Sequence, residues 1–108
     1  MPIEIHDEPA TVRREVEIDA SPEEVWESLA SEDGRDRWLE EDPDRRIEIE
    51  VADEPERLVW WWWSGDAVPS RVEFRVLAAP AGTRVIVTET APTFPVMAFA
   101  SSWTLIAV

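Results

Sequence analysis

The sequence predicts an α+β fold in which short helices pack against an antiparallel β-sheet. The first observation is an unbroken row of four tryptophans at positions 60–63, within the segment 57–64. Aromatic and β-branched residues favour a strand because they pack well on a pleated surface, and Pro55 and Gly65 bound the segment as turn residues do. The second is alternation of apolar and polar residues in several other segments, typical of strands with one solvated face. The third is a helix-start signal at residues 21–24.

The tryptophan row is expected to be a central strand. Successive side chains of a strand point to opposite faces, so Trp60 and Trp62 share one face and Trp61 and Trp63 share the other. Four indoles that each bury roughly 150–250 Å², at about 25 cal/mol/Å², give an upper bound of roughly 15–25 kcal/mol. Whole domains have net stabilities of about 5–15 kcal/mol. The row therefore needs cover, and its neighbours are expected to supply it.

The chain starts with a lead-in and one strand. Residues 1–10 carry two prolines and three acidic residues without a period, so we expect a loose lead-in to a single domain over residues 11–108. The segment 11–19 alternates glutamate with valine and isoleucine, which predicts a strand with one wet face. This strand places Arg14 on the inner face.

Two short helices are expected next. Ser21 is the predicted N-cap, Pro22 occupies the first turn and Glu24 completes a capping box. This helix is expected to run to about Ala30. The segment 31–39 predicts a second short helix, capped at its first residues and ending near its last.

Four further strands and a closing helix complete the prediction. The strands are expected over 46–51, 57–64, 70–77 and 83–90, separated by turns rich in proline, glycine and aspartate. From residue 95 onward, apolar residues recur at helical spacing and predict a C-terminal helix across the sheet. These residues are Val96, Phe99, Ala100, Trp103, Ile106 and Ala107.

Charge and composition limit the partners. The 108 residues include 24 acidic and ten basic ones, which give a formal net charge of −14. Nucleic acids and anionic membrane surfaces are bound through basic patches, so neither is an expected partner. The absence of cysteine fits a reducing cytoplasm, and the N-terminus carries no signal-peptide pattern. Cytoplasmic localisation is therefore predicted.

No residue pattern predicts catalysis, a metal site or a cofactor. His6 is the only histidine, lies in the lead-in and has no cysteine or obvious serine partner. The acidic runs 6–8 and 40–44 lack the spacing of a calcium loop, and the three glycines form no phosphate-binding loop. We therefore predict no catalytic residue, no metal ligand and no cofactor.

The order of elements and several motifs resemble the START-like helix-grip superfamily, also called SRPBCC. Within it, the chain is most similar to homologues of the heat-shock protein 90 ATPase activator. The motifs that carry the resemblance are 16–26, 38–39, 57–60, 70–74 and 82–85. The resemblance implies a helix-grip fold: a curved antiparallel sheet, two short helices after the first strand, and a C-terminal helix packed across the sheet.

The resemblance also implies a cavity between the sheet and the C-terminal helix, and hence a non-catalytic domain that binds a small hydrophobic or aromatic molecule. Since apolar stripes on strands are normally packing, a plain core is the alternative for each apolar residue in this set. The implied ligand-binding residues are Arg14, Trp60, Trp62, Phe74, Val85, Val87, Glu89, Phe99 and Trp103.

Arg14 and Glu89 are the polar residues of that set. If the first and last strands are neighbours, as in the superfamily, the two could form an ion pair at the sheet margin. A buried carboxyl group without a partner would instead have a raised pKa and could bind or protonate a ligand.

Two other functions remain open. One is a protein-interaction module of the co-chaperone type, in which Trp61 and Trp63 form an exposed apolar patch that contacts a partner or a second copy in a homodimer. The other is an enzyme similar to polyketide cyclases, against which the absence of tyrosine, of lysine and of a histidine in the expected cavity counts.

Overall fold

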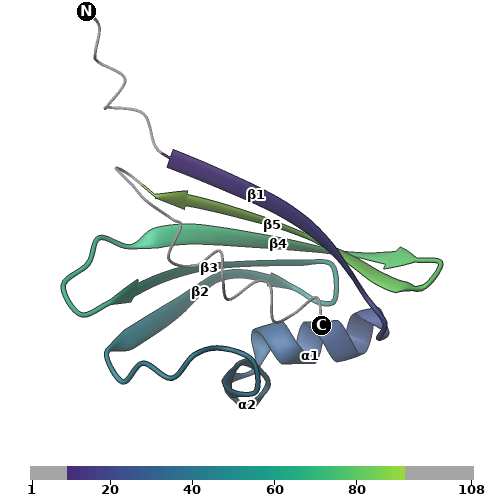
Figure 1. The fold of residues 1–108 in the computed structure, drawn as a ribbon, viewed down its shortest axis with the longest axis horizontal. Coiled ribbons are helices and arrows are strands. Elements are labelled where there is room, and N and C mark those ends of the chain that lie inside the picture. The colour runs from purple at the N-terminus through teal and green to yellow at the C-terminus, as the bar shows by residue number, and fades with distance from the viewer. Residues whose placement is uncertain (1–9, 92–108) are drawn as a thin grey trace, which may run out of the picture.

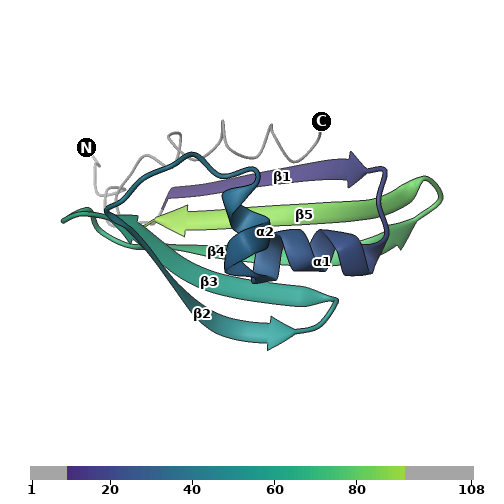
Figure 2. The same ribbon diagram turned by 90° about the horizontal axis from the view of Figure 1, so that it is seen from below.

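The computed structural model describes residues 10–91, which form a curved five-stranded antiparallel sheet with two short helices on one face (Figures 1 and 2). The sheet order is β1-β5-β4-β3-β2, so the first strand lies beside the last. The elements are β1 (Ala10–Ile18), α1 (Pro22–Ala30), α2 (Glu32–Asp36), β2 (Arg45–Asp53), β3 (Arg57–Ser64), β4 (Ser70–Ala79) and β5 (Gly82–Ala91).

The tryptophan row is an interior strand, as the sequence predicts. β3 pairs with β2 on one side and β4 on the other. Its residues Leu58, Trp60 and Trp62 face the helices, and we call this side of the sheet the inner face. Trp61 and Trp63 lie on the opposite, outer face.

The core lies between the inner face and α1. Three residues of α1, Val25, Trp26 and Leu29, are buried against the sheet, because their spacing puts them on one side of the helix. The strand residues of this cluster are Leu58, Trp60, Trp62, Val72, Phe74, Val76, Val85 and Val87. The row of tryptophans is therefore covered on its inner face by α1 and the neighbouring strands.

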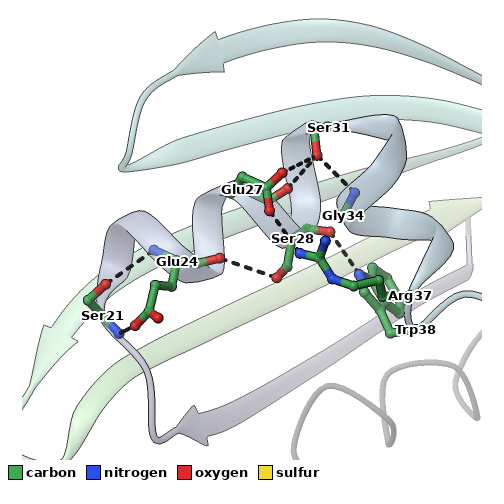
Figure 3. Close-up of polar contacts among 8 residues, drawn as sticks. All are labelled: Ser21, Glu24, Glu27, Ser28, Ser31, Gly34, Arg37 and Trp38. Carbon is green, nitrogen blue, oxygen red and sulfur yellow. Dashed lines mark hydrogen bonds and ion pairs between the residues drawn. The ribbon is translucent and has the colours of Figure 1, made fainter.

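Both helices begin with the predicted serine caps (Figure 3). The backbone N–H of Glu24 donates to Ser21 Oγ at 3.2 Å, and Ser21 N–H donates to Glu24 Oε1 at 2.9 Å, which completes the capping box. Gly34 lets α2 lie against α1, because a Cβ atom there would collide with the backbone of Glu27 and Ser28. Gly34 is thus required by the close packing of the two helices.

Two features differ from the simple pattern. The register of β2 and β3 shifts between Ile49 and Val51, so Glu50 is an extra residue in a β-bulge. Ile49 opposes Trp60 but is 44% exposed, because β2 is an edge strand. The C-terminal helix predicted from residue 95 lies outside the described residues.

Candidate functional site

A carboxyl group is buried on the inner face among aromatic rings. Glu89 of β5 is 1% exposed, and it is the only acidic or basic residue that is fully buried within residues 10–91. It opposes Val12 of β1 and Val72 of β4, and Val72 in turn opposes Trp60 of β3. Glu89 therefore lies near the C-terminal end of β5, opposite the first residues of β1 and β4.

Two side chains hold one oxygen of this carboxyl group. Trp62 Nε1–H donates to Glu89 Oε2 at 3.0 Å, and the Ser70 hydroxyl donates to the same oxygen at 2.7 Å. The second oxygen, Oε1, is buried and has no hydrogen-bond partner among the described residues, and the same is true of Trp60 Nε1. The cluster of Trp60, Trp62, Ser70 and Glu89, here called the carboxyl cluster, thus contains one unused acceptor and one unused donor.

Burial controls the protonation of Glu89. Desolvation disfavours the charged form and raises the pKa of Glu89 to about 7, although the hydrogen bonds from Trp62 and Ser70 favour the carboxylate. Both protonation states are therefore populated near neutral pH. Such a group can accept a hydrogen bond in one state and donate one in the other.

Aromatic and cationic groups surround the carboxyl cluster. The centroid of the Trp60 ring lies 5.4 Å from that of Trp62 and 4.8 Å from that of Phe74, the second pair in an edge-on arrangement. The guanidinium of Arg35 lies 5.4 Å from the Trp60 centroid, and that of Arg45 lies 5.2 Å from the Trp62 centroid. These are cation–π distances.

Both arginines also reach backbone carbonyl groups. Arg35 Nη1 donates to the carbonyl oxygens of Leu29 and Ala30 at 3.0 Å each, at the end of α1. Arg45 Nη1 donates to the carbonyl of Glu40 at 2.9 Å. The arginines therefore tie α2 and the chain that follows it to the inner-face aromatic rings.

Two surface grooves flank this region. One, of about 650 Å³, lies along α1 and includes Ile18, Val25 and Trp38. The other, of about 1010 Å³, lies between α2 and the start of β2 and is lined in part by Arg35 and Arg45. Neither groove is lined by Glu89, so the carboxyl cluster lies beneath the second groove's arginines rather than in its wall.

The structure brings together most of the residues predicted to bind a ligand. The following are buried on the inner face: Trp60, Trp62, Phe74, Val85, Val87 and Glu89. Phe99 and Trp103 lie outside the described residues.

The ion pair considered between Arg14 and Glu89 does not form. The two strands are neighbours, but Arg14 opposes Val87 and is exposed, whereas Glu89 is held by Trp62 and Ser70. Because β1 is an edge strand, the long side chain of Arg14 can keep its guanidinium group in water, and it does not need to be buried beside Glu89.

Sequence reasoning missed three members of the site. Ser70 is two residues before Val72 and four before Phe74, so strand alternation already places it on the inner face, and this signal could have found it. Arg35 and Arg45 carry no such signal. Their positions over the two rings depend on how α2 and β2 pack against the sheet.

The outer face carries the other two tryptophans. Trp61 is 38% exposed, and its Nε1–H donates to Glu50 Oε1 at 2.9 Å. Arg71 also donates two hydrogen bonds to Glu50, at 2.9 and 3.1 Å. Trp63 is half-buried beside it. The bulge residue Glu50 therefore fixes the orientation of an exposed indole.

Within residues 10–91, no group of three or more acidic or histidine side chains is placed to hold a metal ion. In the same part of the chain, neither helix has the length and apolar character needed to cross a membrane.

Solved structures share this architecture, although no family model and no curated protein sequence matches the chain. Protein MLL2253 from Mesorhizobium loti has 17% identity and a TM-score of 0.70, with 91% of this chain and 94% of that chain covered. The Aha1 dimer from Colwellia psychrerythraea has 16% identity and a TM-score of 0.69, with 90% of each chain covered.

CalU16 from Micromonospora echinospora has 20% identity and a TM-score of 0.66, with 88% of this chain and 71% of that chain covered. Such neighbours are SRPBCC structures of the polyketide cyclase and Aha1-like type. At these identities the likeness concerns the fold, and the described sheet and helices agree with the element order that the sequence motifs predicted. Residues 10–91 therefore have the curved sheet and the two short helices of the helix-grip fold found in the START-like, or SRPBCC, structures.

Proposed function

We propose that this domain is a non-catalytic, cytoplasmic binding module for a small hydrophobic, ring-containing molecule. The molecule would bind between the inner face of the sheet and the C-terminal segment. The residues proposed to line the site are those predicted from the sequence, Arg14, Trp60, Trp62, Phe74, Val85, Val87, Glu89, Phe99 and Trp103.

The observation that carries this proposal is the buried carboxyl group of Glu89 with one oxygen unused. A buried polar group without a partner costs free energy, and nearly all such groups in proteins are paired. An apolar side chain would fill the same space without this cost. A position that keeps a carboxyl group among aromatic rings is better explained by a ligand that uses it.

The surroundings of Glu89 support a ring-containing ligand. Binding sites for small molecules are mostly apolar and contain a few polar groups that fix orientation. Trp60, Trp62 and Phe74 provide flat apolar surfaces, and Glu89 provides the polar group. We propose that the ligand approaches from the groove that contains Arg45, because the side chain of Arg45 both lines this groove and lies over the Trp62 ring.

Intrinsic tryptophan emission tests the proposal. A flavonoid, a sterol and a fatty acid are added separately, and both emission and melting temperature are recorded. A true ligand should shift or quench the emission and raise the melting temperature, since binding to the folded state stabilises it. Trp62→Phe, which removes a hydrogen bond to Glu89, should weaken binding about tenfold.

Trp61→Phe is the matched control, because it removes an indole of the same strand from the outer face. This variant should keep the affinity of the unsubstituted protein. If none of the probes alters emission or melting temperature up to its solubility limit, the inner face is a closed core and the proposal fails.

A second candidate function is protein interaction through the outer face. It rests on Trp61, an exposed indole held in a fixed orientation by Glu50. Exposed, rigid tryptophans are frequent at the centre of interfaces. One of the similar structures is described as a dimer, and a homodimer of this chain is the partner that we propose for this face.

A further inference from the structure

We infer that the ligand presents an uncharged hydroxyl group to Glu89, and that the site discriminates against ligands whose polar end is a carboxylate. This inference rests on the proposed binding function and specifies the chemical class of ligand.

The first step concerns the two unused atoms of the carboxyl cluster. Glu89 Oε2 already accepts hydrogen bonds from Trp62 and Ser70, which leaves Oε1 to meet a ligand. Trp60 Nε1–H can only donate. Trp60 Nε1–H therefore needs a hydrogen-bond acceptor. Glu89 Oε1 needs a hydrogen-bond donor when Glu89 is ionised.

A hydroxyl group matches both requirements. It donates one hydrogen and accepts through its oxygen lone pairs, so it can serve either atom, as a donor to Glu89 Oε1 or as an acceptor from Trp60 Nε1. It can also accept from Glu89 when that residue is protonated. A carboxylate only accepts, so it can satisfy Trp60 but not an ionised Glu89.

The second step concerns charge. From β1, the charged group on the inner face near Glu89 is Arg14, which is exposed and opposes Val87, two residues before Glu89. From α2 and β2, Arg35 and Arg45 lie over the Trp60 and Trp62 rings and bond to backbone carbonyls. The residues of α1 and of β3 and β4 that face the cluster are uncharged.

No cation within residues 10–91 therefore forms an ion pair with Glu89. A ligand carboxylate beside it would put two negative charges into one poorly solvated site, which is unfavourable. An alcohol or phenol brings no second charge. The burial of Glu89 without a cation thus favours neutral hydroxylated rings over aromatic or fatty acids.

Calorimetric titration with matched probes tests the inference. The probes are 2-naphthol, 2-naphthoate and naphthalene, which share one ring system and differ in the polar end. At about pH 8, where Glu89 is mostly ionised, 2-naphthol should bind about tenfold more tightly than 2-naphthoate. Below about pH 6 this preference should shrink, because Glu89 becomes protonated.

Two Glu→Gln variants localise the effect. Glu89→Gln should lose the pH dependence of the preference and bind 2-naphthoate more tightly at about pH 8. Glu50→Gln is the matched control, since Glu50 also accepts a hydrogen bond from an indole but lies on the outer face. It should behave as the unsubstituted protein does.

A third variant keeps the inference testable if Glu89→Gln does not fold. Ser70→Ala retains Glu89 but removes a hydrogen bond that favours its charged form, so the pH at which the preference changes should rise. The hydroxyl inference is wrong if 2-naphthoate binds as tightly as 2-naphthol at about pH 8. It is also wrong if neither Glu89→Gln nor Ser70→Ala changes the pH dependence of the preference for 2-naphthol. In both cases the binding function stands. If none of the three probes binds, both are wrong.

Discussion

At the scale of single residues, Glu89 is the position where stability and function conflict. The carboxyl group has two hydrogen-bond donors on one oxygen, yet burial still raises its pKa to about 7 from the usual 4.5. A raised carboxyl pKa means that the folded protein holds this proton more tightly than the unfolded chain does. Stability must then fall as the pH rises from about 4.5 to about 7.

Glu89→Gln should remove this pH dependence. Glutamine is similar in shape and never ionises, so the variant should be more stable than the unsubstituted protein at about pH 8, by up to about 3 kcal/mol. Near pH 4 the two proteins should differ little, because Glu89 is protonated in both the folded and the unfolded chain. Urea denaturation followed by circular dichroism across this pH range measures the difference.

Glu50→Gln again serves as the control, because the pKa of Glu50 is lowered by its hydrogen bonds to Arg71 and Trp61. Removing the charge of Glu50 in this variant should not stabilise the protein at about pH 8. A stability difference between unsubstituted protein and Glu89→Gln that stays constant with pH would show that Glu89 titrates normally in the folded state.

At the scale of elements, the serine-capped helices hold the inner-face cover in place. Ser31 ends α1 and begins α2: its hydroxyl donates to the Glu27 carbonyl and accepts from Gly34 N–H, each at 2.9 Å (Figure 3). Trp38 Nε1 donates to the Ser28 carbonyl at 2.8 Å. These bonds join α2 and the turn after it to α1 without using the sheet.

The capping box predicts a measurable stability effect. Ser21→Ala should lower the free energy of unfolding by about 0.5–2 kcal/mol, because the first-turn N–H groups of α1 lose their side-chain partner. Denaturant titration measures the change. The affinity of any inner-face ligand should not change, since Ser21 lies away from the carboxyl cluster.

Ser28→Ala is the control on the same helix. Among residues 10–91, the Ser28 hydroxyl bonds only to the carbonyl one turn earlier, at 3.2 Å from Glu24 O, and alanine is the better residue inside a helix. It should leave stability unchanged or slightly higher. Equal effects of the two substitutions would contradict a capping role for Ser21.

At the scale of the whole molecule, the two faces of the sheet have opposite characters. The inner face carries the core and Glu89, while arginine–glutamate pairs lie on the outer face, some of them between strands and one of them along β4. The pairs are Arg57–Glu73, Arg71–Glu50, Arg75–Glu73 and Arg84–Glu17, at 2.6–3.4 Å. Exposed pairs contribute little to stability, so their main effect here is to offset the negative charge of the outer-face glutamates in an otherwise acidic protein.

The outer face gives the test for the proposed homodimer. Sedimentation at high protein concentration should show a dimer, and Trp61→Glu should give a soluble monomer, because a charge at the centre of an apolar interface opposes association. Val68→Glu is the control, since Val68 is also exposed but lies in the connection between β3 and β4. A monomeric unsubstituted protein would exclude this use of Trp61.

The sequence by itself determined the strands, the caps and the face on which each tryptophan of β3 lies. These features depend on residues that are close in the chain: side chains alternate along β3, and Ser21 and Glu24 are three positions apart. It also identified Glu89 as an inward-facing carboxyl group, because alternation along β5 places it with Val85 and Val87.

Only the tertiary structure decided what Glu89 contacts. Its partners Trp62 and Ser70 lie 27 and 19 residues away in the chain, and no local pattern links these positions. The choice depends on the register of three strands, which is set by packing across the sheet rather than by any one strand. The same reason explains why Arg14 stays in solvent and why Arg35 and Arg45 reach the tryptophan rings: their positions follow from how distant segments meet.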